Sequence, residues 1–165
     1  MDPGSAFERY HDELFRYLML LTGERELAEE AVQDAFVKLL KKPPQDENVR
    51  AWLYRVATNA ARDGADRQRR LRLTLRRAWK RAEPNPTAPA ADEGVERGER
   101  AAWVRAALAQ LSGRERTVLL MREEGFSHQE IAKTVGTTVK SVGSMVARAL
   151  NKLEAKLKEA RHQVE

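Results

Sequence analysis

The chain has 165 residues, and its 30 Lys and Arg outweigh its 25 Asp and Glu to give a net charge of +5. A surplus of cations favours a polyanionic partner or an anionic surface. Cysteine is absent, which excludes disulfides and thiolate metal sites. No apolar run reaches the length of a membrane span or a signal-peptide core, so we expect a soluble, cytoplasmic protein of one or two small domains.

The first predicted helix starts near Phe7. Apolar residues recur from Phe7 through Leu14 to Leu21 at helical spacing, and the period stops at Gly23. The preceding residues, Met1 to Ala6, resemble a disordered tail or an expression remnant, and we expect them to lie outside the fold.

A second helix is predicted from about Glu24 to Leu40, and Pro43 and Pro44 prevent its continuation because neither has an amide hydrogen. Its apolar surface is wider than one buried face requires. Either this helix is buried on two sides, or it bears an exposed apolar strip with an acidic border that docks on another protein. The apolar strip consists of Val32, Phe36, Val37 and Leu40, and the border of Glu29, Glu30 and Asp34.

A third helix is predicted to begin after Asn48, which suits an N-cap, and to reach about Arg70, with a basic stretch to Arg81 that extends it. A polar stripe beside Trp52 consists of Arg55, Asn59 and Arg62. An aromatic ring, an amide and guanidinium groups together suit unstacked nucleic-acid bases. The alternative is that Trp52 belongs to the core and that the arginines are solvated.

The charge changes sign after the third helix. The stretch from Arg62 to Arg81 has nine Lys or Arg and two Asp, whereas the stretch from Glu83 to Glu99 has five acids and one Arg. The acidic stretch is rich in Pro and Ala, a composition typical of a flexible linker. No alternating strand pattern occurs. The sequence therefore predicts an all-α protein with two small helical domains, at 7–75 and 100–160, joined by a flexible Pro-rich acidic linker at 76–99.

Two helices are predicted directly after the linker. The first covers 102–111, with Val104, Leu108 and Leu111 facing inward. Ser112 to Glu115 then has the S-x-x-E form of a capping box and opens a helix to about Glu124.

The last two predicted helices have the spacing of a helix-turn-helix. Ser127 to Glu130 is a second capping box, and Gly136 ends the short helix that it opens. A longer helix follows to about Leu157, with an apolar face of Val139, Val142, Val146, Leu150, Leu153 and Leu157. Such a pair is typical of DNA-binding domains, although a helical hairpin with a solvated basic face has the same spacing. The outward face of the longer helix consists of Lys140, Ser141, Ser144, Arg148 and Lys152.

Taken in order, these stretches resemble the extracytoplasmic-function (ECF) group of bacterial RNA polymerase sigma factors, over nearly everything from Phe7 to Leu157. The stretches are LTGERELAEEAVQDAFVKLL, NVRAWLYRVATNAARDGADRQRR, the acidic linker, LSGRERTVLLMREEGFSHQEIAKTVG and SVGSMVARALNKL. The resemblance implies a sigma factor that binds core RNA polymerase and directs promoter-specific initiation. The first domain would be sigma region two and the second sigma region four.

The resemblance implies three binding surfaces. The second helix would dock on the clamp helices of the largest polymerase subunit through Glu30, Val32, Gln33, Asp34, Phe36, Val37 and Leu40. The first domain would open the −10 element through Lys41, Lys42, Asn48, Trp52, Arg55, Asn59, Arg62, Arg67, Arg69 and Arg70, and Asn59 stands where the family contacts a flipped base. The last helix and its surroundings would bind the −35 element through Gln129, Thr137, Thr138, Lys140, Ser141, Ser144, Met145 and Arg148.

The chain departs from the family where SVGSMVARAL stands in place of the common TVKSRLHRAR, so that Gly143 and Met145 replace a Lys and an Arg. Each lost cation weakens salt-dependent DNA binding. The partners that the resemblance implies are core RNA polymerase, including the flap of its second-largest subunit, and promoter DNA. Family members are often held by an anti-sigma factor, and no membrane partner is expected.

Other functional classes have weaker support. No catalytic constellation, phosphate loop or metal-ligand cluster is visible, so neither an enzyme nor a cofactor is expected. The main alternative is a LuxR-like regulator that binds duplex DNA as a dimer, because the stretch that starts at Leu111 resembles that module too. The helical first half argues against the receiver domain of such a regulator. A helical adaptor without a role in transcription is the third class.

Overall fold

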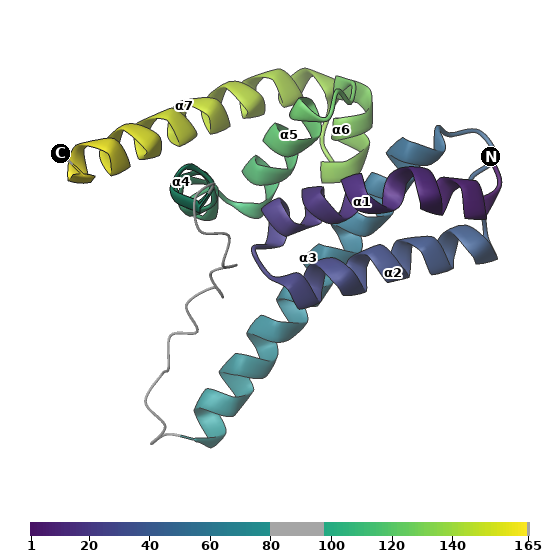
Figure 1. The fold of residues 1–165 in the computed structure, drawn as a ribbon, viewed down its shortest axis with the longest axis horizontal. Coiled ribbons are helices and arrows are strands. Elements are labelled where there is room, and N and C mark those ends of the chain that lie inside the picture. Colours follow the sequence, from purple (N-terminus) through teal and green to yellow (C-terminus); the bar gives the residue numbers. More distant parts are fainter. Residues whose placement is uncertain (80–97, 165) are drawn as a thin grey trace.

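The computed structural model describes residues 1–79 and 98–164, and within these ranges the chain forms α-helices and no strand (Figure 1). The helices are α1 (Pro3–Thr22), α2 (Arg25–Lys41), α3 (Val49–Ala78), α4 (Gly98–Ala109), α5 (Gly113–Glu123), α6 (His128–Val135) and α7 (Val139–Val164). The predicted all-α fold is confirmed. Within the described ranges, no helix combines the length and the apolar character that crossing a bilayer requires.

The first residues of the chain belong to the fold, so the expected disordered tail is a wrong prediction. The Asp2 carboxylate caps α1 by accepting a hydrogen bond from the Ser5 amide at 3.2 Å. Pro3 occupies the first turn, where a missing amide hydrogen costs nothing. Ala6 is fully buried. These signals precede the first large apolar residue, which is why a search for apolar periodicity passes over them.

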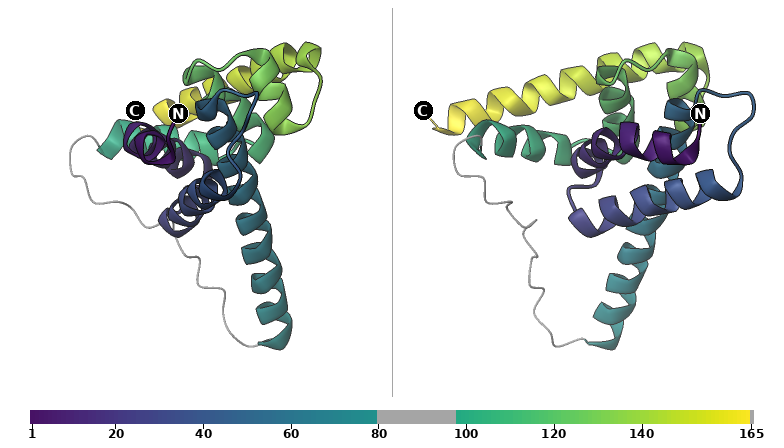
Figure 2. Two further views of the ribbon diagram at one scale, coloured as in Figure 1. Left: turned by 90° about the vertical axis from the view of Figure 1, so that its right-hand side faces the viewer. Right: turned by 45° about the vertical axis from the view of Figure 1, so that its right-hand side comes forward.

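Helices α1, α2 and α3 pack against one another as the first domain (Figure 2). Its core encloses two polar groups that satisfy each other. Thr58 Oγ1 donates to the carbonyl oxygen of Tyr54 at 2.6 Å and lies 2.7 Å from the hydroxyl of Tyr17. Because threonine has one hydroxyl hydrogen, Tyr17 is the donor of the second bond. Burial raises the pKa of Tyr17, which keeps this phenol protonated.

Both predicted capping boxes are present in the second domain, which consists of α4 to α7. Ser112 Oγ accepts from the Glu115 amide at 3.2 Å, and the Glu115 carboxylate accepts from the Ser112 amide at 3.1 Å. Ser127 and Glu130 repeat this exchange at 3.1 and 3.0 Å. Gly136 ends α6 with a φ of 71°, in the left-handed region. Each capping box stabilises the start of its helix by about 1 kcal/mol. Helices α5 and α6 therefore begin directly after Ser112 and Ser127, as the sequence predicts.

The buried face of the second domain differs from the predicted one at three positions. Val104, Val139 and Leu150 are exposed, although the apolar pattern places them inward. Ala107 and Ala149 are buried instead. Alanine lets helices approach closely, and a pattern that follows large side chains does not count it.

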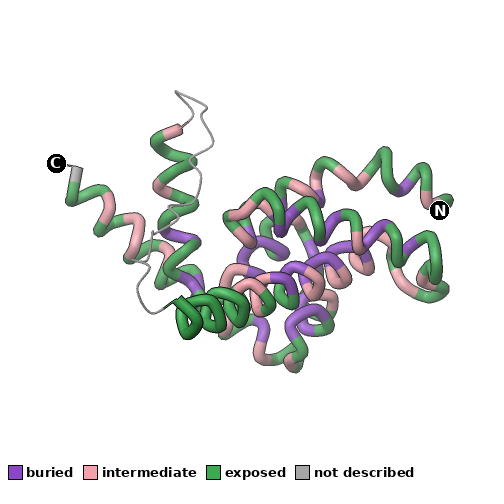
Figure 3. The backbone as a smooth tube through the Cα atoms, turned by 90° about the horizontal axis from the view of Figure 1, so that it is seen from below, coloured by how far each residue is buried: buried purple, intermediate pink, exposed green. Residues whose placement is uncertain are grey.

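The two domains lie against each other, which the prediction of freely tethered domains did not anticipate. Helices α1 and α3 contact α4, α5 and α6, and one cluster of buried apolar residues continues through both domains. The rings of Tyr54 and Phe126 meet across the junction with centroids 4.7 Å apart. Figure 3 shows buried residues running through the packed helices of both domains, and Figure 1 shows the C-terminal half of α3, which is exposed, projecting from the body.

The predicted linker at 76–99 falls mostly outside the described residues. Its first three residues, 76–78, continue α3, and its last two, 98 and 99, begin α4. The predicted extension of the third helix therefore exists as far as Ala78. The domain bounds at 7–75 and 100–160 stay predictions.

Candidate nucleic-acid and partner interfaces

The apolar strip on α2 is only half exposed. Val37 and Leu40 expose 45% and 68% of their surface, but Val32 and Phe36 expose 2% and 7%. The expectation of exposure is thus wrong for Val32 and Phe36, because α2 packs between α1 and α3 and is buried on two sides. Phe36 meets the ring of Phe7 edge-on at 5.0 Å. Phe7 is itself 47% exposed, so it adds an apolar neighbour that the sequence did not assign to this surface.

The acidic border of the strip lies at the surface. Glu30 contacts Arg67 at 3.4 Å, and Asp34 contacts Lys38 at 2.9 Å. Gln33 is exposed. Ion pairs with this much exposure contribute little to stability, so a partner can replace them at small cost.

The polar stripe on α3 is partly engaged by other side chains. Arg55 donates to both oxygens of Glu47, at 2.9 and 3.1 Å. Arg62 donates to the amide oxygen of Asn59 at 3.2 Å, and Asn59 is half-buried. Trp52 is half-buried and packs against the core. Trp52 therefore supports the fold with one part of its ring and reaches the surface with the rest.

The remaining residues predicted to bind the −10 element are at the surface. Asn48 caps α3, because its side-chain oxygen accepts from the amides of Arg50 and Ala51 at 2.9 and 3.3 Å. The cap does not use the amide nitrogen of Asn48. The exposed cations of this group are Lys41, Lys42, Arg67, Arg69 and Arg70. The basic surface continues along α3 through Arg72, Arg76 and Arg77, which were not assigned to it from the sequence.

The outward face of α7 makes its hydrogen bonds almost entirely within its own helix. Ser141 Oγ lies 2.7 Å from Thr138 Oγ1, and Ser144 donates to the Ser141 carbonyl at 3.0 Å. Arg148 donates to the Ser144 carbonyl at 3.4 Å. Lys140 is exposed. Of the other predicted −35 contacts, Gln129 is exposed, and Thr137 and Met145 are half-buried.

Lys152 is less available than its place on this outward face suggests. It contacts the Glu115 carboxylate at 2.9 Å, and this hydrogen bond lowers the pKa of Glu115. The ion pair ties α7 to the start of α5. Lys140 and Arg148 are exposed and, among the described residues, have no carboxylate within ion-pair distance.

A cluster around Arg50 joins the two domains, and the sequence analysis did not find it. Arg50 Nε contacts Glu13 at 2.7 Å, and its Nη2 contacts the Glu124 carboxylate at 3.2 Å. The guanidinium also lies 4.4 Å from the ring centre of Phe126. Burial alone would lower the pKa of Arg50, but the hydrogen bond and charge of Glu13, together with the charges of Tyr54 and Glu124, raise it above its ordinary value. Arg50 thus joins α1, α3 and the turn before α6.

A second contact across the junction involves the polar stripe itself. Lys133 on α6 forms an ion pair with Glu47, the same carboxylate that holds Arg55. The hydrogen bond from Lys133, followed by that from Arg55, lowers the pKa of Glu47. Arg55, one of the predicted −10 contacts, is therefore held by Glu47, which also binds Lys133 of the second domain.

Two family models match the chain, one in each domain. The model described as sigma-70 region 2 matches residues 6–71, and that described as sigma-70, region 4 matches residues 101–153. The ECF RNA polymerase sigma factor SigM of Mycobacterium tuberculosis is 31% identical, over 89% of this chain and 72% of SigM. SigG of the same species is 28% identical over 93% of this chain, which spans about half (48%) of the length of SigG.

Solved structures with a similar fold exist. CnrH, solved in complex with the cytosolic domain of CnrY, is 26% identical with a TM-score of 0.66, over 95% of this chain and 88% of the other. The sigma factor RpoE of Bartonella quintana, solved with the anti-sigma factor NepR, has a TM-score of 0.68 over 94% of this chain and 96% of the other. At 24% identity, this second likeness concerns the fold alone.

Proposed function

This chain belongs to the ECF sigma factors of bacterial RNA polymerase, and we propose that it binds core RNA polymerase and directs initiation at a specific promoter. The observation that carries the proposal is the pairing, in one chain, of two polar helical faces on separate domains. One is the amide and guanidinium stripe of α3, and the other is the exposed face of α7. Two separate DNA-facing surfaces suit a promoter with two separate elements.

We assign the −10 element to the first domain. Extruding a base from the duplex costs a few kcal/mol, so a pocket that rewards only the right base couples recognition to melting. Asn59 offers an amide that can read a base edge, and Trp52 offers part of a ring on which a base can stack. Arg62 lies beside Asn59 and can hold a phosphate.

We assign the −35 element to α7, which would enter the major groove. Lys140 and Arg148 would contact phosphates or guanine edges, and the small serines between them allow close approach. Gly143 and Met145 lower the positive charge of this face relative to the common family sequence, which weakens its salt-dependent binding.

We propose that α2 docks on the clamp helices of the largest polymerase subunit through Val37 and Leu40, with Phe7 beside them. The flap of the second-largest subunit is the proposed partner of the second domain. A further proposed partner is an anti-sigma factor, because the family resemblance includes such regulation. CnrH, at 26% identity, was solved with a domain of a second protein.

Reconstituted transcription tests the proposal. Purified core polymerase and the full chain should yield promoter-specific transcripts from a genomic template, and neither component alone should do so. A complete lack of specific product would defeat the proposal. Tight binding of the chain to duplex DNA as a dimer, without polymerase, would support the LuxR-like alternative instead.

Docking is tested separately with Val37→Asp, which places a charge on the exposed part of the apolar strip. We expect at least a tenfold loss of affinity for core polymerase, about 1.4 kcal/mol. The matched control is Leu73→Asp, at a leucine of the same domain that is similarly exposed (49% against 45%) and lies on the projecting half of α3. Equal losses in both variants would refute the docking surface. Phe36→Ala is a poor test, because truncating a buried phenylalanine costs the fold itself about 3–5 kcal/mol.

A further inference from the structure

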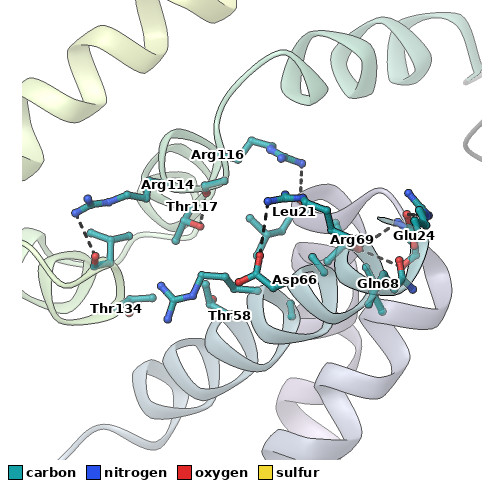
Figure 4. A pocket seen from close by; sticks show the side chains of 18 residues that line it. Leu21, Glu24, Thr58, Asp66, Gln68, Arg69, Arg114, Arg116, Thr117 and Thr134 are labelled. Carbon is teal, nitrogen blue, oxygen red and sulfur yellow. Dashed lines mark hydrogen bonds and ion pairs between the residues drawn. The ribbon is translucent and has the colours of Figure 1, made fainter. Parts of the chain in front are cut away.

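A cleft of about 350 Å³ lies between α3 of the first domain and α5 and α6 of the second (Figure 4). Arginines from both domains line it, and Figure 4 shows Arg114 and Arg116 on one side and Arg69 with Asp66 on the other. The arginines are Arg62, Arg69 and Arg72 on α3, and Arg114 and Arg116 on α5. The volume lies in the range of small-molecule sites.

The acidic residues of the cleft leave most of this positive charge uncompensated. Two carboxylates stand against the five arginines. Glu24 is 3.6 Å from Arg72, and Asp66 is 3.9 Å from Arg69, both longer than a good hydrogen bond. Among the described residues, the other three arginines have no carboxylate within ion-pair distance. The cleft therefore carries an excess of positive charge that favours binding of an anion.

Arg116 is the least satisfied of these cations. Its Nη1 donates to the Leu21 carbonyl at 2.7 Å, which crosses the domain junction. Its Nε is buried and has no hydrogen-bond partner within the described part of the chain. Burial also lowers the pKa of this guanidinium. An unpaired buried donor on a cation costs free energy, and an anion bound beside it would remove that cost.

We propose that this cleft binds a nucleoside di- or triphosphate. The planar fork of arginine matches phosphate oxygens, and arginines on two sides can hold successive phosphates. The floor between them combines apolar residues, such as Leu21, Ala61 and Val135, with threonines, and suits a base and sugar rather than a further charge. Arg114 donates to the Val135 carbonyl at 3.2 Å, so its charge is held at the edge of this floor.

The ligand would contact both domains at once, because the arginines that line the cleft are divided between α3 and α5. Binding to the closed arrangement stabilises that arrangement by mass action. It would also occupy Arg62, which we assign to the −10 surface, and so would oppose open-complex formation. This consequence rests on the proposed function, whereas the binding site does not.

Calorimetric titration of the full chain with ATP, GTP, pyrophosphate and adenosine, at constant ionic strength, tests the site. We expect one saturable site per chain for ATP or GTP, at least tenfold weaker binding of pyrophosphate, and no measurable binding of adenosine. Arg116→Gln and Arg114→Gln should each weaken nucleotide binding at least tenfold. Arg122→Gln is the matched control, because Arg122 is exposed on the same helix and does not line the cleft.

Arg116→Gln also removes the bond to Leu21, so its thermal unfolding is compared with that of the unaltered chain, and Arg114→Gln provides an independent test. Absence of saturable nucleotide binding, or an equal loss in Arg122→Gln, would overturn the site. Binding of single-stranded DNA or an acidic peptide in place of nucleotide would also overturn it and assign the cleft to a macromolecule. These titrations contain no polymerase, so their failure leaves the proposed function standing, and failed transcription leaves the site standing.

Discussion

The two candidate DNA surfaces differ in how far the rest of the chain engages them. On α3, Arg55 is held by Glu47, which also binds Lys133 of the other domain. On α7, Lys140 is exposed, and Arg148 bonds only to its own helix. Arg55 must therefore be released from Glu47 before it can bind DNA, whereas Lys140 and Arg148 are available as they stand. The contact between the domains therefore restricts a residue of the α3 surface and leaves the α7 surface accessible, although both helices are basic.

The largest expected effect follows from breaking the junction with Arg50→Ala. This change leaves Glu13 and Glu124 near each other without the cation between them, which should weaken closure by about 2–4 kcal/mol. Because the chain has no cysteine, fluorophores can be attached through Glu26→Cys and Asn151→Cys, one exposed residue in each domain. The distance between them should grow.

Arg148→Ala is the control for this measurement and should leave the distance unchanged, because Arg148 lies away from the junction. An unchanged distance in Arg50→Ala would show that the apolar contact of Tyr54 and Phe126 holds the domains without the ionic cluster.

A second prediction separates the two surfaces by function. Asn59→Ala should slow open-complex formation about tenfold, the loss of roughly one hydrogen bond to a base, and should leave core binding intact. Lys140→Ala should instead weaken promoter affinity and reduce the slope of its salt dependence by about one. Rapid-mixing fluorescence and filter binding at several salt concentrations measure the two. If Asn59→Ala lost core binding equally, its role would be structural.

The same glycine substitution should have opposite effects in the two helices. An added Cβ at Gly64 would stand 3.0 Å from Leu27 Cδ2, whereas at Gly143 the nearest atom is His128 Cε1 at 3.9 Å. Gly143→Ala should therefore stabilise the protein by about 0.5–1 kcal/mol through helix propensity. Gly64→Ala should destabilise it by about 1 kcal/mol, because overpacking outweighs propensity. Urea unfolding measures both, and effects of the same sign would contradict the contrast.

The smallest expected effect is on pH. The pKa of Glu47 is lowered from its ordinary 4.5, first by Lys133 and then by Arg55. A carboxylate with a lowered pKa adds stability above its ordinary pKa and loses it as the pH falls through the lowered value. Closure should therefore weaken below about pH 4.5, and Glu47→Gln should reduce this dependence. The partial exposure of the ion pair keeps the effect small, and the labelled chain can report it.

The starts and ends of several helices could be predicted from residues a few positions apart in the sequence. The capping boxes at Ser112 and Ser127, and the end of α6 at Gly136, involve partners within three or four residues, so local geometry decides them. Helical periodicity likewise located Asn59 and Lys140 on polar helix faces, and in the structure Asn59 is half-buried and Lys140 is exposed.

Burial and closure depend on residues far apart in the chain. The pattern of α2 leaves Val32 and Phe36 open between core and surface, and they become core because α1 and α3 cover both sides. Arg50 meets Glu124 across 74 positions, and Arg116 meets Leu21 across 95. A periodic pattern records which face of a helix is apolar, but not which helix will cover it. The half-buried strip, the closed junction and the arginine cleft therefore exist only once the seven described helices have packed together.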